Sequence, residues 1–290
     1  MENEILVISP NWLGDAVMAM PAVKQLELAS PAGTKLVILA KRAVAGLWRM
    51  HTSVSEVIEL QGGNKATFAM ARTLRERGFK QVYIFPNSFR SALIPFLARL
   101  PKRRGTVIHA RALMINDGVR FDKSFDDKHQ ALEYLTLVGA PIDSDLSNTG
   151  FVPEAAELPE EFASQVASNT CVAIIPGAAR GDSKRWPFYA EAAKLMLAKN
   201  PELKFFICGS PNEAPLCEQV ANDIGADSAT SLAGKTNLAQ FATVLRKVKL
   251  VLCNDSGGMH LASASGTPVV AMYGLPSPVK TGPLGKNAVI

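Results

Sequence analysis

The stretch "ISPNWLGDAVMAMP", residues 8–21, joins a strand to a helix through one glycine and one acid. Before it, "EILVIS" at residues 4–9 is a short β-branched run typical of a strand. After it, "AVMAMPAVKQLELA" at residues 16–29 is a longer pattern typical of a helix. A dinucleotide-binding turn carries spaced glycines at such a junction, whereas this one has Gly14 followed by Asp15. The junction predicts an α/β domain and argues against a nicotinamide-dependent oxidoreductase.

Strands and helices continue to alternate along the first part of the chain. Alternation at this spacing is typical of a doubly wound parallel sheet, in which helices cross over between parallel strands. Further strands are expected at residues 35–40, 55–60, 81–86 and 105–109, and helices at residues 43–50, at 67–78 ending at Gly78, and at 88–100 with a kink at Pro95.

A segment rich in proline, serine and acidic residues, 141–162, interrupts the alternation and is expected to connect two domains. Beyond it the alternation begins again. We therefore predict two Rossmann-like, doubly wound α/β domains facing each other across a cleft: residues 1–165, with the linker from about residue 141, and residues 166–290. The second domain is expected to have strands at residues 171–176, 203–209, 249–255 and 268–274, and helices at residues 188–200, 213–224, 237–248 and 258–265.

Composition indicates a folded protein with an anionic partner. The 290 residues are 48% hydrophobic, which argues against disorder, and a net charge of +5 favours an anionic ligand without choosing its class. None of the four cysteines belongs to a CxxC pair, and Cys171, Cys208 and Cys253 lie in apolar runs, so we expect free, buried thiols of the kind found in a reducing cytoplasm. Cysteine and histidine are too scattered for a zinc site. The sequence shows neither a signal peptide nor the ~18 apolar residues of a membrane span, so we expect a cytoplasmic protein that at most lies on a membrane.

The loop after Pro176, "GAARGDSKRWP", combines glycines with cationic side chains. Gly177 and Gly181 allow a ligand to approach the backbone, and Lys184 and Arg185 supply positive charge. We expect a phosphate site here. The spacing differs from that of a P-loop, and an ordinary surface loop with basic residues is the alternative.

A second candidate turn lies in "CNDSGGMHLASASGTP". An expected strand ends at Asp255, and Ser256, Gly257 and Gly258 turn the chain into a helix whose first turn contains His260. Backbone amides at a helix N-terminus bind anions, so an acid and a histidine beside them indicate a ligand site. A core or surface histidine is the alternative.

Two other segments are ambiguous. Glu213, in "CGSPNE", is expected to accept hydrogen bonds from ribose hydroxyls, and the alternative is an acid that complements a helix dipole. The segment "SALIPFLARLPKRRG" combines an apolar face with Lys102, Arg103 and Arg104. It is suited to an anionic amphiphile, and the alternative is a core helix followed by a basic loop.

Five motifs in order resemble a known family: "NWLGDAVMAMPAV", "FPNSFRSALIPF", "IPGAARGDSKRWP", "SLAGKTNL" and "NDSGGMHLASASGTPVVAMYG". Together they are similar to the ADP-heptose:lipopolysaccharide heptosyltransferases of glycosyltransferase family nine. The second and third motifs are most similar to the heptosyltransferase II members. The resemblance covers nearly the whole chain, and five ordered motifs are far more specific than any one of them.

The resemblance implies a GT-B fold and an inverting transfer of L-glycero-D-manno-heptose from ADP-heptose to the heptosyl-Kdo-lipid A inner core of lipopolysaccharide. It implies that the first domain binds the acceptor and the second binds ADP-heptose, with neither a cofactor nor a catalytic metal. The expected partners are the nucleotide sugar and an anionic lipid-linked oligosaccharide, with peripheral contact at the cytoplasmic face of the inner membrane. No nucleic acid partner is expected.

Residue by residue, the resemblance makes Asp15 the general base, and it assigns the nucleotide phosphate to Lys184 and the ribose to Glu213. Further residues are assigned to the two substrates by charge and position in the motifs. The donor's heptose and pyrophosphate are assigned to Asp255, Ser256, Gly257 and His260, with Arg185 and Gly258 added, and the acceptor is assigned to Asn11, Arg90, Lys102, Arg103 and Arg104.

The sequence departs from the family pattern in two places. The C-terminal helices that cross back onto the first domain are missing after "GKNAVI", where another strand is expected to begin, so we expect a truncated sequence. Gly258 stands where the family often has a larger residue. Two other functions stay open: a GT-B transferase with a different sugar nucleotide, since nothing in the sequence identifies the sugar, and a two-domain binding protein without turnover.

Overall fold

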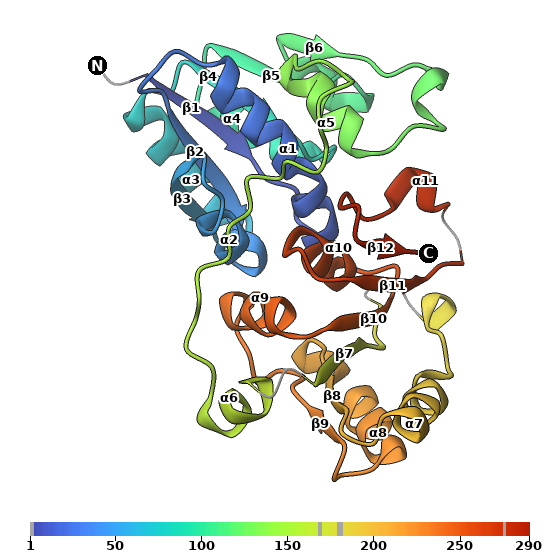
Figure 1. The fold of residues 1–290 in the computed structure, drawn as a ribbon. Helices are drawn as coiled ribbons and strands as arrows, with labels where there is room; N and C mark the ends of the chain where they lie inside the picture. Colours follow the sequence, from blue (N-terminus) through green and yellow to red (C-terminus); the bar gives the residue numbers. More distant parts are fainter. Residues whose placement is uncertain (1–2, 168–169, 179–181, 275–276) are drawn as a thin grey trace. The chain divides into compact units, whose positions relative to one another are not determined.

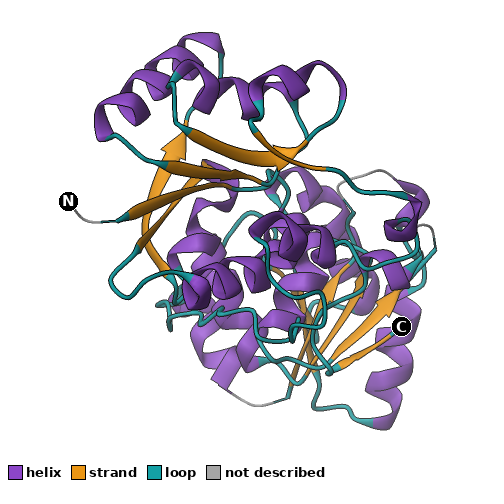
Figure 2. Ribbon diagram, turned by 90° about the horizontal axis from the view of Figure 1, so that it is seen from above, coloured by secondary structure: helices purple, strands orange, loops and turns teal. Residues whose placement is uncertain are grey.

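The computed structural model describes residues 3–167, 170–178, 182–274 and 277–290 (Figure 1). The chain divides into two compact units, Met1–Phe151 and Val152–Ile290. Among the described residues, each unit contains one six-stranded parallel sheet. Figure 2 distinguishes the strands of these sheets from the helices packed against them. The predicted fold class, two doubly wound α/β domains, is confirmed.

The sheet of the first unit has the strand order β3-β2-β1-β4-β5-β6. In the interior of the sheet, Ile8 of β1 is in register with Leu39 of β2 and Ile84 of β4. The strands are β1 (Glu4–Ile8), β2 (Lys35–Lys41), β3 (Val54–Leu60), β4 (Gln81–Ile84), β5 (Lys102–Thr106) and β6 (Asp117–Val119), and the α-helices are α1 (Leu13–Ala29), α2 (Arg42–Arg49), α3 (Asn64–Arg77), α4 (Phe89–Leu97) and α5 (Ala131–Val138).

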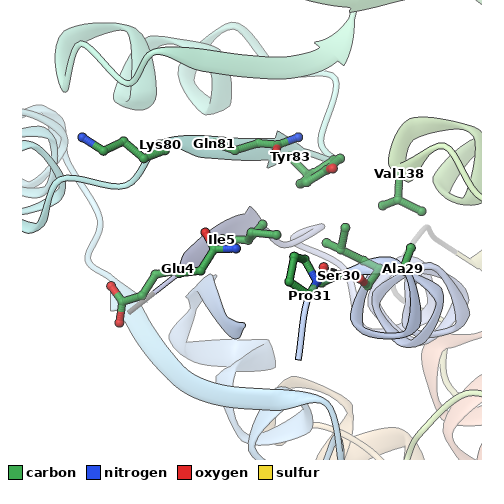
Figure 3. Close-up of a pocket in the computed structure, with 11 residues that line it drawn as sticks. Glu4, Ile5, Ala29, Ser30, Pro31, Lys80, Gln81, Tyr83 and Val138 are labelled. Atoms are coloured by element: carbon green, nitrogen blue, oxygen red, sulfur yellow. Dashed lines mark hydrogen bonds between the residues drawn. The ribbon is translucent and has the colours of Figure 1, made fainter. Parts of the chain in front are cut away.

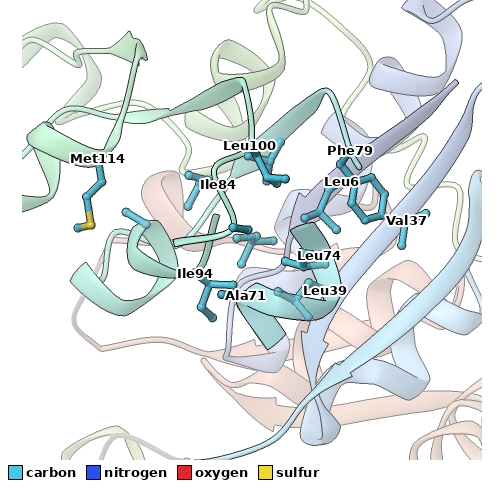
Figure 4. Close-up of a cluster of buried hydrophobic side chains, with 14 of the residues drawn as sticks. Leu6, Val37, Leu39, Ala71, Leu74, Phe79, Ile84, Ile94, Leu100 and Met114 are labelled. Atoms are coloured by element: carbon cyan, nitrogen blue, oxygen red, sulfur yellow. The ribbon is translucent and has the colours of Figure 1, made fainter. Parts of the chain in front are cut away.

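One face of this sheet is buried under α3 and α4. Leu6 of β1 belongs to a hydrophobic cluster with Leu74 of α3 and Ile94 of α4 (Figure 4). Successive side chains of a strand point to opposite faces, so Leu6 and Ile8 of β1 both enter this cluster. Helix α1 instead packs against α2 and α5. These contacts hold α1, whereas pairing with β2 and β4 holds the carboxyl end of β1, from which the turn into α1 starts.

The expected end of α3 is confirmed. Gly78 follows Arg77 with a φ of +76°, a left-handed conformation that glycine adopts without the steric cost of a Cβ atom. Its N–H donates to the Leu74 carbonyl at 3.2 Å. Pro95 lies inside α4, as expected.

Two parts of the first unit differ from the expectation. The strand expected at residues 105–109 lies at Lys102–Thr106, so the basic run belongs to the sheet and not to a loop. The sequence pattern also predicts neither β6 nor α5. Charged side chains hide the apolar pattern of β5, and β6 is only three residues long. Hydrogen-bonded pairing with β4 and β6 stabilises β5 as a strand, although its local sequence pattern does not predict one.

The sheet of the second unit has the strand order β12-β11-β10-β7-β8-β9, so β7 and β10 are neighbours in its interior. The strand expected to begin in "GKNAVI" is present as β12. The strands are β7 (Cys171–Ile175), β8 (Lys204–Ile207), β9 (Ala229–Ser231), β10 (Leu250–Asn254), β11 (Val269–Met272) and β12 (Ala288–Val289), and the helices are α6 (Glu160–Ala167), α7 (Tyr189–Lys199), α8 (Ala214–Ile224), α9 (Leu238–Lys247), α10 (Gly257–Ala264) and α11 (Pro278–Thr281).

The segment between α5 and α6 contains little regular structure. Residues 139–159, all of which are described, contain neither helix nor strand apart from a single antiparallel bridge between His51 and Phe151. All four cysteines are free and buried, as expected for Cys171, Cys208 and Cys253. Over the described ranges, none of the helices combines the length and the apolar character needed to cross a bilayer.

Candidate functional site

Two loops of the second unit leave neighbouring strands at the same edge of the sheet. Ile175, the last residue of β7, is in register with Cys253 near the end of β10. The chain after β7 and the turn after β10 therefore start side by side. Ligands of open α/β sheets bind at this carboxyl edge. The sequence-predicted donor residues lie in these two segments and in the loop after β8.

Lys184 and Asp255 come together although 71 positions separate them in the chain. Lys184 ends a short 3-10 helix, Asp182–Lys184, and its ammonium donates to the Asp255 carboxylate that follows β10. The two side chains are only 17% and 9% exposed, so water screens this pair weakly. Arg185 comes directly after Lys184 and is half-buried. The edge of the sheet thus carries a largely buried cation paired with a buried carboxylate.

The N-terminus of α10 lies beside this ion pair. Ser256 is the N-cap residue, in extended conformation, and its hydroxyl makes no capping hydrogen bond. Its Oγ is buried, and no residue in the described part of the chain bonds to it. The first amides of the helix have no partner within the helix, and they carry the positive end of its dipole. His260 is buried in this first turn. Donor groups therefore converge where an anion would be stabilised.

Close packing explains the glycine at position 258. A Cβ atom there would lie 2.7 Å from Ile175 Cδ1 and 3.3 Å from Ile175 Cγ2. The first turn of α10 thus rests directly on the end of β7. A larger residue would push the helix N-terminus away from the strand unless Ile175 moved.

Glu213 is held against two glycines. A Cβ atom on Gly177 would lie 2.0 Å from Glu213 Oε1, and one on Gly209 would lie 3.1 Å from Glu213 Cβ. Its Oε2 accepts hydrogen bonds from the backbone N–H and the hydroxyl of Ser210, both at 2.7 Å. One oxygen therefore completes a capping box with Ser210 before α8, while the side chain stays beside the loop after β7. The ribose role stays a prediction.

In the first unit, Asp15 lies in the first turn of α1, as expected. The Gln130 side-chain amide donates to Asp15 Oδ1 at 3.4 Å and also lies 3.2 Å from the Tyr134 hydroxyl. Burial and the nearby Asp15 charge raise the pKa of Tyr134, so its phenol stays protonated. The sequence pattern predicts no role for Gln130 or Tyr134, because it does not predict α5. Their spacing of four residues on one helical face was the available signal.

The predicted acceptor residues come from three segments of the first unit: the turn after β1, helix α4 and strand β5. Arg90 donates to the Gly63 carbonyl at 2.6 Å, and Arg103 donates to the carbonyls of Met114 and Leu100 at 2.7 and 2.6 Å. The other three predicted acceptor residues have different partners and positions. Arg104 bonds to Leu137 O and Asp117, Lys102 lies 3.4 Å from Asp117 at the amino end of β5, and Asn11 is half-buried between β1 and α1.

A cavity of about 250 Å³ opens at the other edge of the first sheet (Figure 3). Its walls include Glu4 and Ile5 at the start of β1, and Gln81 and Tyr83 of β4. It is thus separated from Asp15 by the length of β1, and it does not contribute to the candidate site. Among the described residues, no cluster of three or more histidine, cysteine or acidic side chains is arranged to hold a metal ion.

Known proteins resemble the chain over nearly its whole length. It is 32% identical to the lipooligosaccharide heptosyltransferase 2 of Haemophilus ducreyi, over 99% of this chain and 88% of that one. It is 29% identical to the lipopolysaccharide heptosyltransferase 2 of Escherichia coli K12, over 98% and 86%. The solved structure of E. coli ADP-heptose LPS heptosyltransferase II superposes with a TM-score of 0.82 at 28% identity, covering 99% of this chain and 89% of that one.

The family comparison covers the second unit and the part of the first unit from residue 67 onward. The profile of Glycosyltransferase family 9 (heptosyltransferase) matches residues 67–290. This range includes the Lys184 loop, Glu213 and the turn at Asp255, which geometry independently groups at one edge of the second sheet. The chain belongs to glycosyltransferase family 9, the heptosyltransferases.

Proposed function

We propose that the protein transfers L-glycero-D-manno-heptose from ADP-heptose to the heptosyl-Kdo-lipid A inner core of lipopolysaccharide, with inversion at the anomeric carbon. The observation that carries the proposal is the Lys184–Asp255 pair beside the N-terminus of α10. The relatives that this chain matches over 88% and 86% of their length are heptosyltransferases 2, which supports the choice of sugar and acceptor.

The donor's diphosphate would bind at the carboxyl edge of the second sheet. Lys184 supplies a charge that is only 17% exposed, and the first amides of α10 supply hydrogen-bond donors. Arg185 adds a second cation to this loop. Asp255 and His260 would contact the heptose, and Glu213 would accept from the ribose. All these groups belong to the second unit.

The leaving group needs the largest stabilisation. As the bond between the anomeric carbon and the diphosphate oxygen breaks, its electron pair leaves with ADP, and negative charge grows on the bridging oxygen. Lys184, the α10 amides and the Ser256 hydroxyl would stabilise that charge, the task that a metal ion performs in other transferases. Each such donor typically lowers the activation barrier by about 3–4 kcal/mol. In this proposal catalysis requires neither metal nor cofactor.

Asp15 would act as the general base. The α1 dipole stabilises its carboxylate, and Gln130 holds one of its oxygens. A stabilised carboxylate is a weak base, so the acceptor hydroxyl would lose its proton late, as its oxygen bonds to the anomeric carbon. The proton passes to Asp15, the sugar passes to the acceptor, and ADP departs. Attack opposite the leaving group gives inversion.

The acceptor is anchored in lipid, and the first unit offers apolar side chains suited to such a partner. Trp12 and Phe89 are each 54% exposed, and Ile108 and Leu113 are 36% and 87% exposed. They follow β1, β4 and β5, neighbouring strands whose carboxyl ends share one edge of the sheet. We propose that this edge meets the cytoplasmic face of the inner membrane. Vesicle binding tests the contact: Leu113→Glu should weaken it, while Leu195→Glu, at the 70% exposed Leu195 of α7, should not.

One experiment tests the reaction. The protein is incubated with ADP-heptose and a lipopolysaccharide core lacking the second heptose, and the product is weighed by mass spectrometry. A mass gain of one heptose is expected. Transfer from another sugar nucleotide, supplied in a parallel panel, would replace the proposed donor. Binding of ADP-heptose without any product would favour a protein that binds without turnover.

A further inference from the structure

Asn254, the last residue of β10, is completely buried, and its side chain makes hydrogen bonds to three residues of other segments. Its side-chain oxygen accepts from the Trp186 backbone N–H at 3.0 Å and from the Tyr189 hydroxyl at 2.8 Å. Its side-chain NH₂ donates to the Pro176 carbonyl at 2.7 Å. The partners determine the orientation of the amide, because a carbonyl needs a donor and a backbone N–H needs an acceptor.

These three bonds tie together the segments that form the candidate donor site. Pro176 follows β7, Trp186 lies two residues after Lys184, and Tyr189 begins α7. The Trp186 and Tyr189 rings also pack edge to face, with centroids 5.1 Å apart. Asn254 itself is the chain neighbour of Asp255, the partner of Lys184. The backbone on both sides of the Lys184–Asp255 pair is therefore anchored at a single side chain.

We infer that Asn254 is a positioning residue that sets the place of the Lys184 ammonium for the donor's diphosphate. The inference rests on the proposed function, because it assumes that Lys184 binds nucleotide phosphate. Asn254 acts through Lys184 and does not touch the ligand. A lysine binds phosphate strongly only if its backbone is already held in place. Otherwise the entropy cost of ordering the backbone on binding offsets the free energy of the phosphate contact.

The chemistry of the site requires a neutral amide. Burial raises the pKa of Tyr189, so its hydroxyl remains a donor and needs the Asn254 oxygen. Aspartate would keep this acceptor but would face the Pro176 carbonyl at 2.7 Å with an oxygen instead of a donor. It would also place a second negative charge next to Asp255, where the diphosphate is expected. Leucine has a similar size and would leave all three partners without a bond.

The test compares Asn254→Leu and Asn254→Asp with a control that loses a buried hydrogen bond elsewhere in the same unit. Thr267 is 3% exposed and donates to the Leu245 carbonyl at 2.6 Å, so Thr267→Val is that control. ADP affinity is measured by calorimetry, and thermal unfolding is followed in parallel. The Asn254 variants should weaken ADP binding by about tenfold or more, while Thr267→Val should change it less than about twofold.

A double-mutant cycle separates positioning from general loss of structure. In a Lys184→Ala background, Asn254→Leu should change the ADP dissociation constant by less than about twofold, because its route of action is already absent. In steady-state kinetics, Asn254→Leu should raise the KM for ADP-heptose and leave the KM for the acceptor unchanged. If Asn254→Leu does not fold, Tyr189→Phe, which removes one of the three bonds, is used in the same cycle.

The outcomes distinguish this inference from the proposed function. Additive effects of Asn254→Leu and Lys184→Ala, or equal losses in Asn254→Leu and Thr267→Val, would overturn the positioning role. If Lys184→Ala itself leaves ADP affinity unchanged, the phosphate role of Lys184 fails, and the positioning role fails with it. Weak ADP binding by Lys184→Ala with normal binding by both Asn254 variants would overturn the positioning role alone.

Discussion

Lys184, which follows β7, donates to the carboxylate of Asp255, which follows β10, and both side chains are largely buried. An anionic ligand must therefore compete with Asp255 for the Lys184 ammonium. A buried cation with a resident counter-ion avoids the cost of an unpaired charge before the ligand arrives. We therefore expect substitutions of Lys184 and of Asp255 to have different effects on ADP affinity.

Lys184→Ala should weaken ADP binding by about 10- to 100-fold, the usual size of a charge-assisted hydrogen bond. Calorimetry with ADP measures the change. Lys194→Ala removes the same charge from an exposed position on α7 and serves as the control. An equal loss in both variants would mean that net charge, and not the site, controls affinity.

Asp255→Asn should leave ADP affinity unchanged or improve it, because the diphosphate no longer competes with a carboxylate for Lys184. Turnover with ADP-heptose should nevertheless fall, because the proposed contact to the sugar is lost. Binding of ADP and the rate of product formation are measured on the same protein. Weaker ADP binding by Asp255→Asn would contradict the competition between carboxylate and diphosphate.

Asp15→Asn should leave ADP-heptose binding nearly intact and reduce transfer by about 10²- to 10⁴-fold, because the amide cannot accept the proton. The Gln130 contact at Asp15 Oδ1 survives in asparagine, so little structural change is expected. Binding is measured by calorimetry and transfer by mass spectrometry. Glu76→Gln, an exposed change on α3, is the control. Parallel loss of binding and turnover in Asp15→Asn would argue against a general base.

Gly258→Ala should lower the unfolding temperature, because the new methyl group meets Ile175 Cδ1 at 2.7 Å. Overpacking of this kind costs about 1–3 kcal/mol. Adding Ile175→Val, which removes that Cδ1 atom, should restore part of the lost stability. Thermal unfolding of the two single variants and the double variant measures the coupling. Strictly additive effects would show that the two side chains do not compete for the same space.

His51 predicts a dependence of stability on pH. Its ring accepts from the Ser53 N–H through Nδ1, faces the Met20 carbonyl through Nε2, and is 3% exposed. Burial lowers its pKa from the ordinary 6.5 to about 4. A lowered histidine pKa means that the folded state resists protonation. Stability from the neutral ring is therefore complete above about pH 6.5 and declines as the pH falls toward 4.

The expected loss between pH 7 and pH 5 is about 2 kcal/mol from this residue. Urea unfolding at both pH values measures it. His51→Gln carries no titrating ring, so its free energy of unfolding should change less over the same interval, although its stability at pH 7 should be lower. An unchanged pH dependence in His51→Gln would assign the effect to other groups.

The sequence alone determined the order of most strands and helices, because apolar periodicity, glycine and proline are local signals. Such local signals predict three features that the structure contains: the end of α3 at Gly78, the position of Asp15 in the first turn of α1, and the N-terminus of α10 near Ser256. The charged strand β5 and the short strand β6 do not, since strand pairing forms them against their local composition.

The tertiary structure alone decided which side chains meet. Gln130 lies 115 positions from Asp15, and Asn254 lies 68 positions from Trp186. Nothing local in either member of such a pair identifies the other. Parallel strands place the ends of distant segments at one edge of a sheet, and only the completed strand order makes them neighbours. The sequence therefore indicates which residues are candidates for the site, whereas the assembled sheet determines which of them contact one another.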